Sequence, residues 1–314
     1  MQIIEQTTTF KLPGKSAVAI GKFDGVHLGH QALIHRIVAQ KDRGLIATVF
    51  TFDTLASAFF GGETKELTTR DEKRHIFEKM GVDVLIEFPL NAVTAATEAE
   101  AFVHGFLVRQ MQAAYICAGP DLSFGKMGAG NYELLARFAK EHGYQVELID
   151  KVMIDQEAVS STRVREAVRQ GHMEAVTRML GTPYIVNGYV EHGKKLGRTI
   201  GMPTANLIPE AVKLLPPNGV YYSRVVLDGV VYKGISNVGC KPTVSDERVM
   251  GVETFLYDFE GDIYGRNLSV ELLSFRRPEM KFDSVESLKA QMMQDIAAGR
   301  LMADKIFESD RACH

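Results

Sequence analysis

The chain has 314 residues, of which 46 % are hydrophobic and 24 % are charged, and its formal net charge is −3. This balance is typical of a globular protein long enough for two domains, and it argues against nucleic acid as a main partner. The three cysteines, Cys117, Cys240 and Cys313, are too few and too far apart for a disulfide framework or a zinc knuckle.

The sequence shows no targeting or membrane signal. No run of about 18 apolar residues occurs. The opening residues, MQIIEQTTTF, lack a basic region followed by an apolar core, as a secretory signal would have. We therefore expect a cytoplasmic protein, in a reducing compartment, without a membrane or nucleic-acid partner.

Strand-like and helix-like segments alternate through the first 180 residues. The segments predicted as strands are 17–20, 45–52, 84–88, 114–118 and 146–152. Helical patterns lie between them at 65–80, 97–112 and 131–143, and another follows the first strand. This alternation predicts a parallel sheet covered by helices on both faces, with ligands at the carboxyl ends of its strands.

The segment 17–30 (AVAIGKFDGVHLGH) combines a short apolar strand, a glycine-bracketed turn and a helix start. This layout points backbone N–H groups and a helix N-terminus at a phosphate. His27 and His30 are three residues apart, so both imidazoles project from one side of the first helical turn. Taken alone, the pair is also compatible with a metal site or with incidental histidines, although no nearby Cys or carboxylate completes a metal-binding set.

Two later segments of the first half are candidate ligand loops. Residues 119–126 (GPDLSFGK) follow the fourth strand, although such a loop is often only a turn. Residues 159–165 (VSSTRVR) open a helix, where Ser and Thr are ordinary N-caps. Two Arg in a first helical turn oppose the helix dipole, and a bound anion would explain them.

A helix from Met173 to Leu180 ends at Gly181 and is followed by Pro183, so we place the domain boundary after residue 182. Beyond it, short strand-like segments and turns predict a small antiparallel barrel, closed by a helix over 284–298. The predicted strands are 184–190, 220–227, 230–236, 252–257 and 268–275.

The segment 193–207 (GKKLGRTIGMPTANL) lies within the predicted barrel. Its glycines and lysines suit phosphate, but it lacks the P-loop pattern of many ATPases. If the chain is extended there, Thr204 and Asn206 face the same way and offer two hard oxygen donors suited to Mg²⁺.

The motifs of the first half resemble those of the bacterial bifunctional riboflavin kinase/FAD synthetases. His27-Leu28-Gly29-His30 is similar to the His-x-Gly-His signature of the nucleotidyltransferases. The resemblance implies an ATP and phosphate site formed by Gly21, Phe23, Asp24, Gly25, His27, His30, Ser161, Thr162 and Arg163, with both His acting on the α-phosphate. It also implies a nucleotide and flavin loop with Asp121, Phe124 and Gly125, in which Leu122 replaces the aromatic residue that is usual in the family.

The second half is similar to the riboflavin kinase part of the same family. The resemblance implies that ATP and its phosphates are held by Gly193, Lys195, Gly197, Arg198, Gly201, Thr204 and Asn206, with Mg²⁺ on the last two. Phosphoryl transfer to an alcohol needs a proton acceptor, and by resemblance this base is Glu253, while Glu271 is the alternative that spacing leaves open. Arg277, Glu279 and Phe282 match a family segment near the flavin.

The family match implies a two-domain α/β fold: a Rossmann-like nucleotidyltransferase domain over 1–182 and a β-barrel kinase domain over 183–314. Its expected substrates and products are riboflavin, FMN, FAD and ATP, with Mg²⁺ as cofactor. Two alternatives stay open: a kinase whose first domain is weak or inactive, and a flavin-sensing regulator. One departure motivates the first alternative, because the family's Pro-His-Pro after Thr-Phe-Asp/Glu is replaced here by Thr54-Leu55-Ala56.

Overall fold

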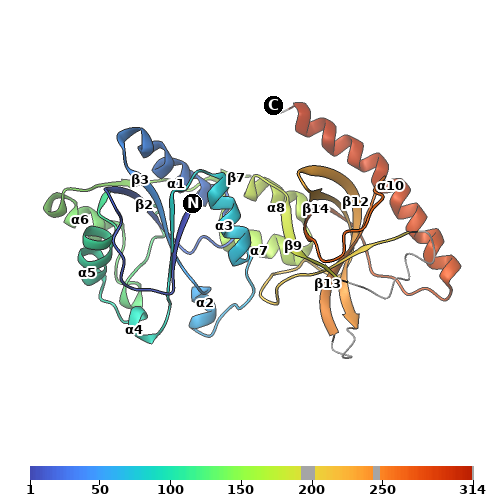
Figure 1. Cartoon of the computed structure of the whole chain (residues 1–314), viewed down its shortest axis with the longest axis horizontal. Coiled ribbons are helices and arrows are strands. Elements are labelled where there is room, and N and C mark those ends of the chain that lie inside the picture. The colour runs from blue at the N-terminus through green and yellow to red at the C-terminus, as the bar shows by residue number, and fades with distance from the viewer. Residues whose placement is uncertain (192–201, 243–247, 313–314) are drawn as a thin grey trace. The chain divides into compact units, whose positions relative to one another are not determined.

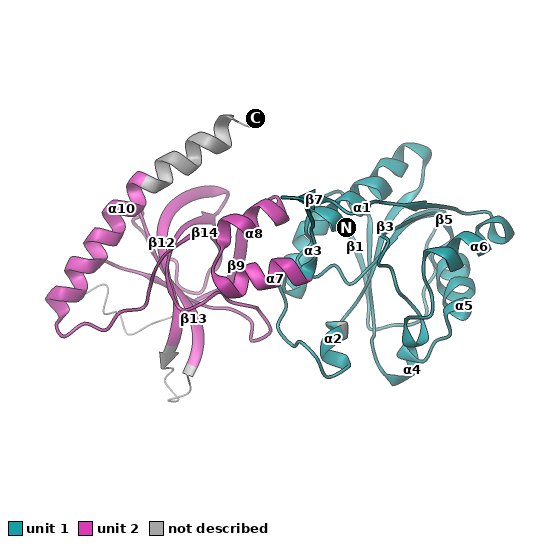
Figure 2. Ribbon diagram, turned by 180° about the vertical axis from the view of Figure 1, so that it is seen from behind, with its two compact units in different colours: residues 1–161 teal, residues 162–314 magenta. Residues whose placement is uncertain are grey.

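The computed structural model describes residues 1–191, 202–242 and 248–312 (Figure 1). The chain forms two compact units, Met1–Ser161 and Thr162–His314 (Figure 2). Helices α7 (Ser161–Gln170) and α8 (Met173–Leu180) thus lie almost wholly in the second unit, whereas the sequence placed them before the boundary. The expected boundary at 182 remains a prediction about which fragments fold on their own.

The first unit contains a six-stranded parallel sheet with the order β1-β4-β3-β2-β5-β6. Its strands are β1 (Gln2–Glu5), β2 (Ser16–Ile20), β3 (Ile46–Phe52), β4 (Val84–Phe88), β5 (Ala113–Ala118) and β6 (Gln145–Leu148). The predicted parallel sheet is confirmed. The edge strand β1 was not expected, because its residues are mostly exposed and carry no strong apolar pattern.

Alternating side chains of the central strands supply two separate cores. Ala17 and Ala19 of β2 belong to the cluster that includes α1 (Leu28–Ala39) and α3 (Arg70–Lys79). Val18 and Ile20 belong to the opposite cluster, with residues of α5 (Ala99–Phe102), η2 (Val103–Gln110) and α6 (Tyr132–His142). Since successive strand residues point to opposite faces, helices cover both faces of the sheet.

Local signals set the helix ends. α3 begins five residues later than predicted, because Thr69 forms a capping box with Glu72 and so fixes the start. The helix predicted over 97–112 is divided into α5 and the π-helical η2. α6 starts after the Asn131 cap and ends at Gly143, whose φ of 72° favours glycine. The shorter elements are η1 (Gln40–Arg43), α2 (Ala56–Phe59), α4 (Ala92–Ala95), η3 (Lys126–Gly128), β7 (Met153–Ile154) and β8 (Glu157–Ala158).

The second unit contains a closed antiparallel barrel with the order β10-β13-β12-β11-β14-β9, as predicted. Its strands are β9 (Tyr184–Glu191), β10 (Ala205–Ile208), β11 (Gly219–Leu227), β12 (Val230–Pro242), β13 (Arg248–Leu256) and β14 (Asn267–Pro278). β10 contains the extended Ala205 and Asn206, whereas Thr204 directly precedes the strand, so a shared orientation of Thr204 and Asn206 stays a prediction.

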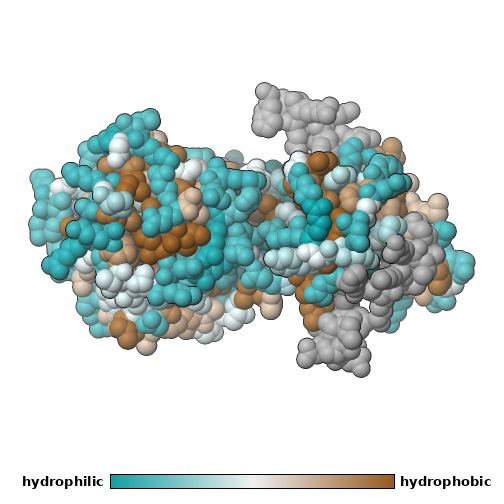
Figure 3. Space-filling model, viewed as in Figure 1, coloured by the Kyte–Doolittle hydropathy of each residue, from teal (hydrophilic) through white to brown (hydrophobic). Residues whose placement is uncertain are grey.

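The helix α10 (Val285–Ala312) packs against the barrel. Tyr222, Ile235 and Tyr257 form an apolar cluster that Ile296 of α10 joins. An ion pair reinforces this contact, because Arg277 of β14 donates to the buried carboxylate of Asp295 at 2.6 and 2.9 Å. Hydrophilic residues cover much of the visible surface, with hydrophobic patches between them (Figure 3). Among the described residues, no helix has the length and apolar composition needed to cross a membrane.

Candidate active sites

The turn between β2 and α1 is held in a strained conformation by hydrogen bonds from a neighbouring segment. Phe23 and Val26 have positive φ angles of 49° and 41°, which is unusual for residues other than glycine. The N–H of Gly25 donates to Thr68 Oγ1 at 3.1 Å, and the N–H of Leu67 donates to Asp24 Oδ1 at 2.8 Å. Backbone strain of this kind persists where surrounding contacts enforce it, and it is common at functional sites.

His27 is the N-cap of α1. Its Nδ1 accepts a hydrogen bond from the N–H of His30 at 3.4 Å, so Nδ1 carries no proton and the neutral ring is protonated at Nε2. The two imidazoles are stacked, with centroids 3.8 Å apart and an interplanar angle of 17°. The ring of Phe23 packs edge-on against His30. The predicted pairing of His27 and His30 on one side of the helix is therefore present.

Burial keeps both imidazoles neutral. The side chain of His27 is buried, and desolvation lowers its pKa to about 4, although a backbone hydrogen bond opposes part of the shift. Desolvation and the neighbouring His27 lower the pKa of His30 well below its ordinary value. His30 Nδ1 is buried without a hydrogen-bond partner. Two neutral imidazoles at a helix N-terminus can donate hydrogen bonds to an anion without introducing a fixed positive charge.

A pocket opens at the carboxyl ends of β2, β3 and β4, where ligands of parallel sheets bind. Aromatic side chains dominate its walls, and Gly21 of the turn forms one edge. The phenylalanines that line it are Phe50, Phe52, Phe88, Phe102 and Phe124. Sequence reasoning selected only Phe124 of these, because the others follow ordinary strand and helix patterns.

Of the residues predicted to bind nucleotide and flavin in the loop after β5, only some lie at the pocket. Phe124 and Gly125 line the pocket. Gly125 has a φ of 71°, and a Cβ there would lie 2.6 Å from Ala99 Cα, so only glycine fits. Asp121 is exposed and forms a 2.7 Å ion pair with Lys151. Leu122, which stands where the family usually has an aromatic residue, packs against the core cluster and is not among the residues that line the pocket.

The predicted phosphate motif at 161–163 begins α7. The hydroxyl of Ser161 donates to the carbonyl oxygen of Asp24 at 2.7 Å, which connects this motif to the glycine turn. Thr162 and Arg163 are the next residues of α7 and belong to the second unit, so their phosphate role stays a prediction. Asp24 acts on the turn itself, since its side chain accepts from Leu67 and its backbone from Ser161.

In the second unit, strand register aligns polar side chains across the barrel. Asn206 of β10 pairs with Glu191 of β9 and with Glu253 of β13, and Glu253 pairs with Asn237 of β12. Paired residues share a face of the sheet. The flanking Thr254 is fully buried, so this polar row lies on the face opposite to the barrel core. Asn237 was missed from the sequence because only strand pairing places it beside Glu253.

Thr204 Oγ1 donates to Glu253 Oε1 at 2.6 Å, so the two residues selected from separate motifs are in direct contact. The rival carboxylate, Glu271, is instead bonded to Arg224 across β11 and β14. Thr204, Asn206 and Glu253 together supply a hydroxyl, an amide oxygen and a carboxylate. Such a hard oxygen set fits Mg²⁺, which takes few protein ligands and keeps several waters.

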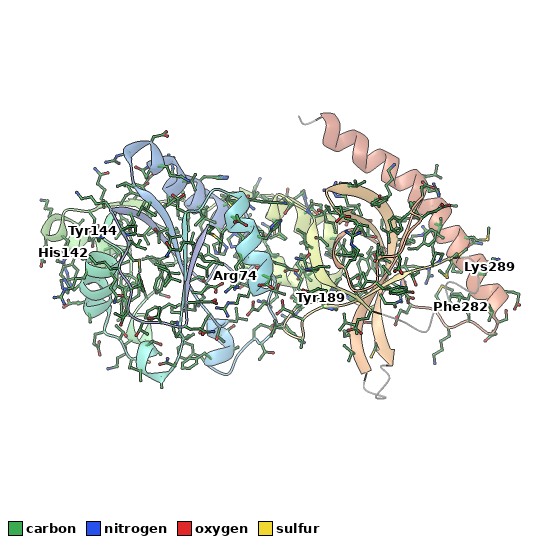
Figure 4. The ribbon with its side chains drawn as sticks, in the orientation of Figure 1. Arg74, His142, Tyr144, Tyr189, Phe282 and Lys289 are labelled. Carbon is green, nitrogen blue, oxygen red and sulfur yellow. The ribbon has the colours of Figure 1, made fainter. Side chains whose placement is uncertain are left out.

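The other residues predicted for the kinase site differ in where they lie. Glu279 accepts from Asn218 at 3.1 Å and from Asn237 at 3.5 Å, which places it near the polar row. Arg277 is bonded to Asp295, and Phe282 lies near the start of α10 (Figure 4). The predicted glycine-rich residues lie outside the described residues: Gly193, Lys195, Gly197, Arg198 and Gly201.

Comparisons with known proteins agree with this two-part arrangement. A family model described as FAD synthetase matches residues 10–163, and one described as riboflavin kinase matches residues 180–303. A relative from Listeria monocytogenes is 36 % identical over 88 % of this chain and 89 % of its own length. An Escherichia coli K12 relative is 33 % identical over 90 % of this chain and 91 % of its own length. Both are described as bifunctional riboflavin kinase/FMN adenylyltransferase.

A solved structure is also similar over nearly the whole chain. It is a crystal structure from Streptococcus pneumoniae, described as a macrolide-efflux protein. It is 29 % identical, has a TM-score of 0.84, and is matched over 95 % of this chain and 98 % of its own.

Proposed function

The chain belongs to the bifunctional riboflavin kinase/FMN adenylyltransferase family, and from this premise we propose which of its residues carry each reaction. The family chemistry has two steps. Riboflavin and ATP give FMN and ADP, and FMN and a second ATP then give FAD and pyrophosphate. The observation that most supports separate sites is that the stacked His pair lies in one unit and the Thr204–Glu253 contact lies in the other.

In the first unit, the triphosphate of ATP lies at the turn between β2 and α1, and FMN places its ring system in the aromatic pocket beside Gly21. The phosphate oxygen of FMN attacks the α-phosphorus, and the bond to pyrophosphate breaks. Negative charge grows on the phosphate oxygens in this step, and neutral His27 can stabilise it by donating from Nε2. The ring of His30 stacks on that of His27 in the first turn of α1.

In the second unit, the 5′-hydroxyl of riboflavin attacks the γ-phosphorus of ATP while Glu253 accepts its proton. The Thr204 hydroxyl donates to Oε1 of Glu253, and this bond holds the carboxylate in position. Mg²⁺, when bound, neutralises phosphate charge, and Thr204 and Asn206 are the residues proposed to hold it. Asn237 and Glu279 extend the polar row toward the flavin side of the site.

We place the protein in a reducing cytoplasm. The support is that Cys117, in the first unit, is buried and free, while Cys240, in the second, is free and exposed. Riboflavin, ATP and their products are then available in the same compartment.

A chromatographic assay tests the function. The intact protein is incubated with riboflavin, ATP and Mg²⁺, and the flavins are separated over time. We expect FMN to appear first and FAD to follow. FMN without FAD would indicate a kinase with an inactive first unit, and flavin binding without ATP consumption would indicate a sensor.

A further inference from the structure

The first unit holds a second cluster of titratable side chains, which none of the motifs above includes. It consists of His104 on η2 and of Glu141 and His142 at the end of α6. One donor atom from each residue lies within 4.8 Å of the other two. In the ranges 1–191, 202–242 and 248–312, this is the one group of three His, Cys, Asp or Glu side chains that converges in this way.

His142 contributes a ring nitrogen that has no hydrogen-bond partner and could bind a metal ion. Its side chain is 16 % exposed, and its Nε2 is buried without a hydrogen-bond partner. The nearest carboxylate oxygen, Glu141 Oε1, is 3.6 Å away, which is too far for a hydrogen bond. A buried polar atom without a partner loses its hydration without compensation, so such an atom calls for an explanation.

Aromatic rings hold His142 in place. Phe138 and Tyr144 both stack against it, with centroid distances of 5.9 and 6.4 Å, and the ring of His104 meets it edge-on at 4.7 Å. The Tyr144 hydroxyl donates to the carbonyl oxygen of Leu135 at 2.7 Å, and therefore it does not satisfy the imidazole. Figure 4 shows His142 and Tyr144 next to each other in the first unit. Stacking explains where the rings lie but not why Nε2 has no partner.

We propose that His104, Glu141 and His142 bind a first-row divalent cation of the Zn²⁺ class. Two imidazoles and one carboxylate are a common zinc set, with bonds of about 2.0–2.2 Å and a fourth position for water. The side chain of Glu141 is 61 % exposed, so it can rotate and shorten the separation of the donor atoms. The bound ion would connect η2 to α6, two elements that pack on the same face of the sheet.

The cluster is separate from the catalytic turn. The chain leaves the carboxyl end of β5, passes through α6 and enters the parallel strand β6 at its amino end. His142, at the end of α6, therefore lies near the amino ends of the strands, whereas the pocket lies at their carboxyl ends. A cation there therefore contributes to the stability of the first unit and takes no part in phosphate chemistry. η2 is π-helical, and such segments are frequent at functional sites.

Metal titration of the intact, metal-free protein tests the proposal, with Mg²⁺ in excess to occupy oxygen-only sites. We expect one equivalent of Zn²⁺ to bind and to raise the melting temperature. Co²⁺ in its place should give the visible absorption of a four-coordinate ion. The variant His142→Phe keeps an aromatic ring in the stack but removes the nitrogen, and it should weaken Zn²⁺ binding about tenfold or more. His75→Phe, at an exposed histidine of the same unit, is the matched control.

Equal Zn²⁺ affinity in His142→Phe and the unaltered protein would overturn the proposal, as would the absence of stoichiometric binding by the unaltered protein. The second result would leave the cluster as an aromatic stack alone. FAD formation from supplied FMN, which we assign to the first unit, checks that the first unit of the variant is intact. If His142→Phe does not fold, Glu141→Gln on the exposed side of the cluster provides the same comparison.

Discussion

At the scale of single residues, the same burial that keeps His27 and His30 neutral also shapes their chemistry. A charged imidazole would bind the ground-state triphosphate strongly, whereas a neutral donor responds to charge that develops during the reaction. The cap formed by His27 fixes its tautomer through the N–H of His30. The geometry proposed for catalysis and the stability of α1 are therefore connected at this position.

His30→Ala should lower kcat for adenylyl transfer by about 10²-fold or more, which is the effect of losing one well-placed oxyanion donor. Steady-state kinetics of FAD formation from FMN measures it, with riboflavin phosphorylation as the internal control because that site lies in the other unit. An effect on KM alone would contradict the proposed role and would indicate simple ATP binding.

The stability of the first unit should fall on acidification. The pKa of His27 is lowered from 6.5 to about 4 by burial, so between these values the unfolded chain binds a proton that the folded chain does not. The free energy of unfolding therefore decreases as the pH falls from 6.5 to 4, by up to about 3 kcal/mol from this group.

Hydrogen exchange of peptides from β2 and α1, followed from pH 7 to pH 4.5 with intrinsic exchange rates taken into account, measures this dependence. His27→Asn retains a capping side chain but does not titrate, so its opening free energy should depend less on pH. His75→Asn, at an exposed position, should behave like the unaltered protein. A pH dependence that is unchanged in His27→Asn would show that other groups cause it.

Glu253→Gln should abolish FMN formation and leave FAD formation from supplied FMN intact. The amide cannot accept the hydroxyl proton, and general base catalysis contributes about 10²–10⁴-fold. Rates of both half-reactions on the same preparation measure the effect. If more than about a tenth of the kinase rate survives, Glu253 is not the base. Glu271→Gln is the comparison, and because Glu271 pairs with Arg224 we expect it to affect stability more than rate.

At the scale of elements, the segment after β3 lacks two prolines of the family motif, and the Asp53 that precedes their positions is held by hydrogen bonds. The N–H of Asp53 donates to the carbonyl oxygen of Phe88 at 3.0 Å, and Asp53 Oδ1 accepts from the N–H of Leu90 at 3.0 Å. The preceding Phe52 lines the aromatic pocket. These bonds connect the ends of β3 and β4, but they do not restrict φ of residues 54–56 as prolines would.

Adenylyl transfer should therefore be the weaker activity, with kcat/KM for FMN at least about tenfold below that for riboflavin phosphorylation, or about 1.4 kcal/mol. Kinetics of both half-reactions decides this, and comparable efficiencies would contradict it. Thr54→Pro should raise the FAD rate alone. It is a cleaner change than restoring the full motif, because Leu55 is buried and a histidine there would lose apolar contact.

At the scale of the whole molecule, the two units should be separable, and α8 should decide how stable the second one is. The side chains of Met173, Val176 and Met179 are at most 3 % exposed, and α8 contacts β9 and β14. Burial of one such side chain contributes about 1.5–3 kcal/mol.

A fragment of residues 183–314 should fold and phosphorylate riboflavin, but a fragment of residues 162–314 should be more stable by about 3 kcal/mol or more. Thermal and denaturant unfolding of the two fragments measures the difference. Equal stability would show that α8 contributes nothing to the barrel, and an insoluble longer fragment would show that the barrel depends on the first unit.

The sequence by itself determined the parallel sheet, the barrel and most of their elements, because periodic apolar residues and glycine stops act locally. Resemblance to contiguous family motifs also selected His27, His30, Thr204 and Glu253, whose catalytic and binding roles stay predictions. The edge strand β1 and the division of the helix predicted over 97–112 needed the folded chain, because exposure and a shift in hydrogen bonding leave little trace in the apolar pattern.

Only the tertiary structure decided how separate segments combine. The fold brings the Thr204 hydroxyl to the carboxylate of Glu253, whereas the carboxylate of Glu271 is bonded to Arg224. Strand register selects such partners, which are far apart in the chain. In the folded chain, the Asp24 side chain accepts a hydrogen bond that stabilises its own turn, and Leu122 packs against the core cluster. Folding also brings the ring of His104 into contact with that of His142. Burial, and with it the neutral state of the His pair, exists only once both faces of the sheet are covered.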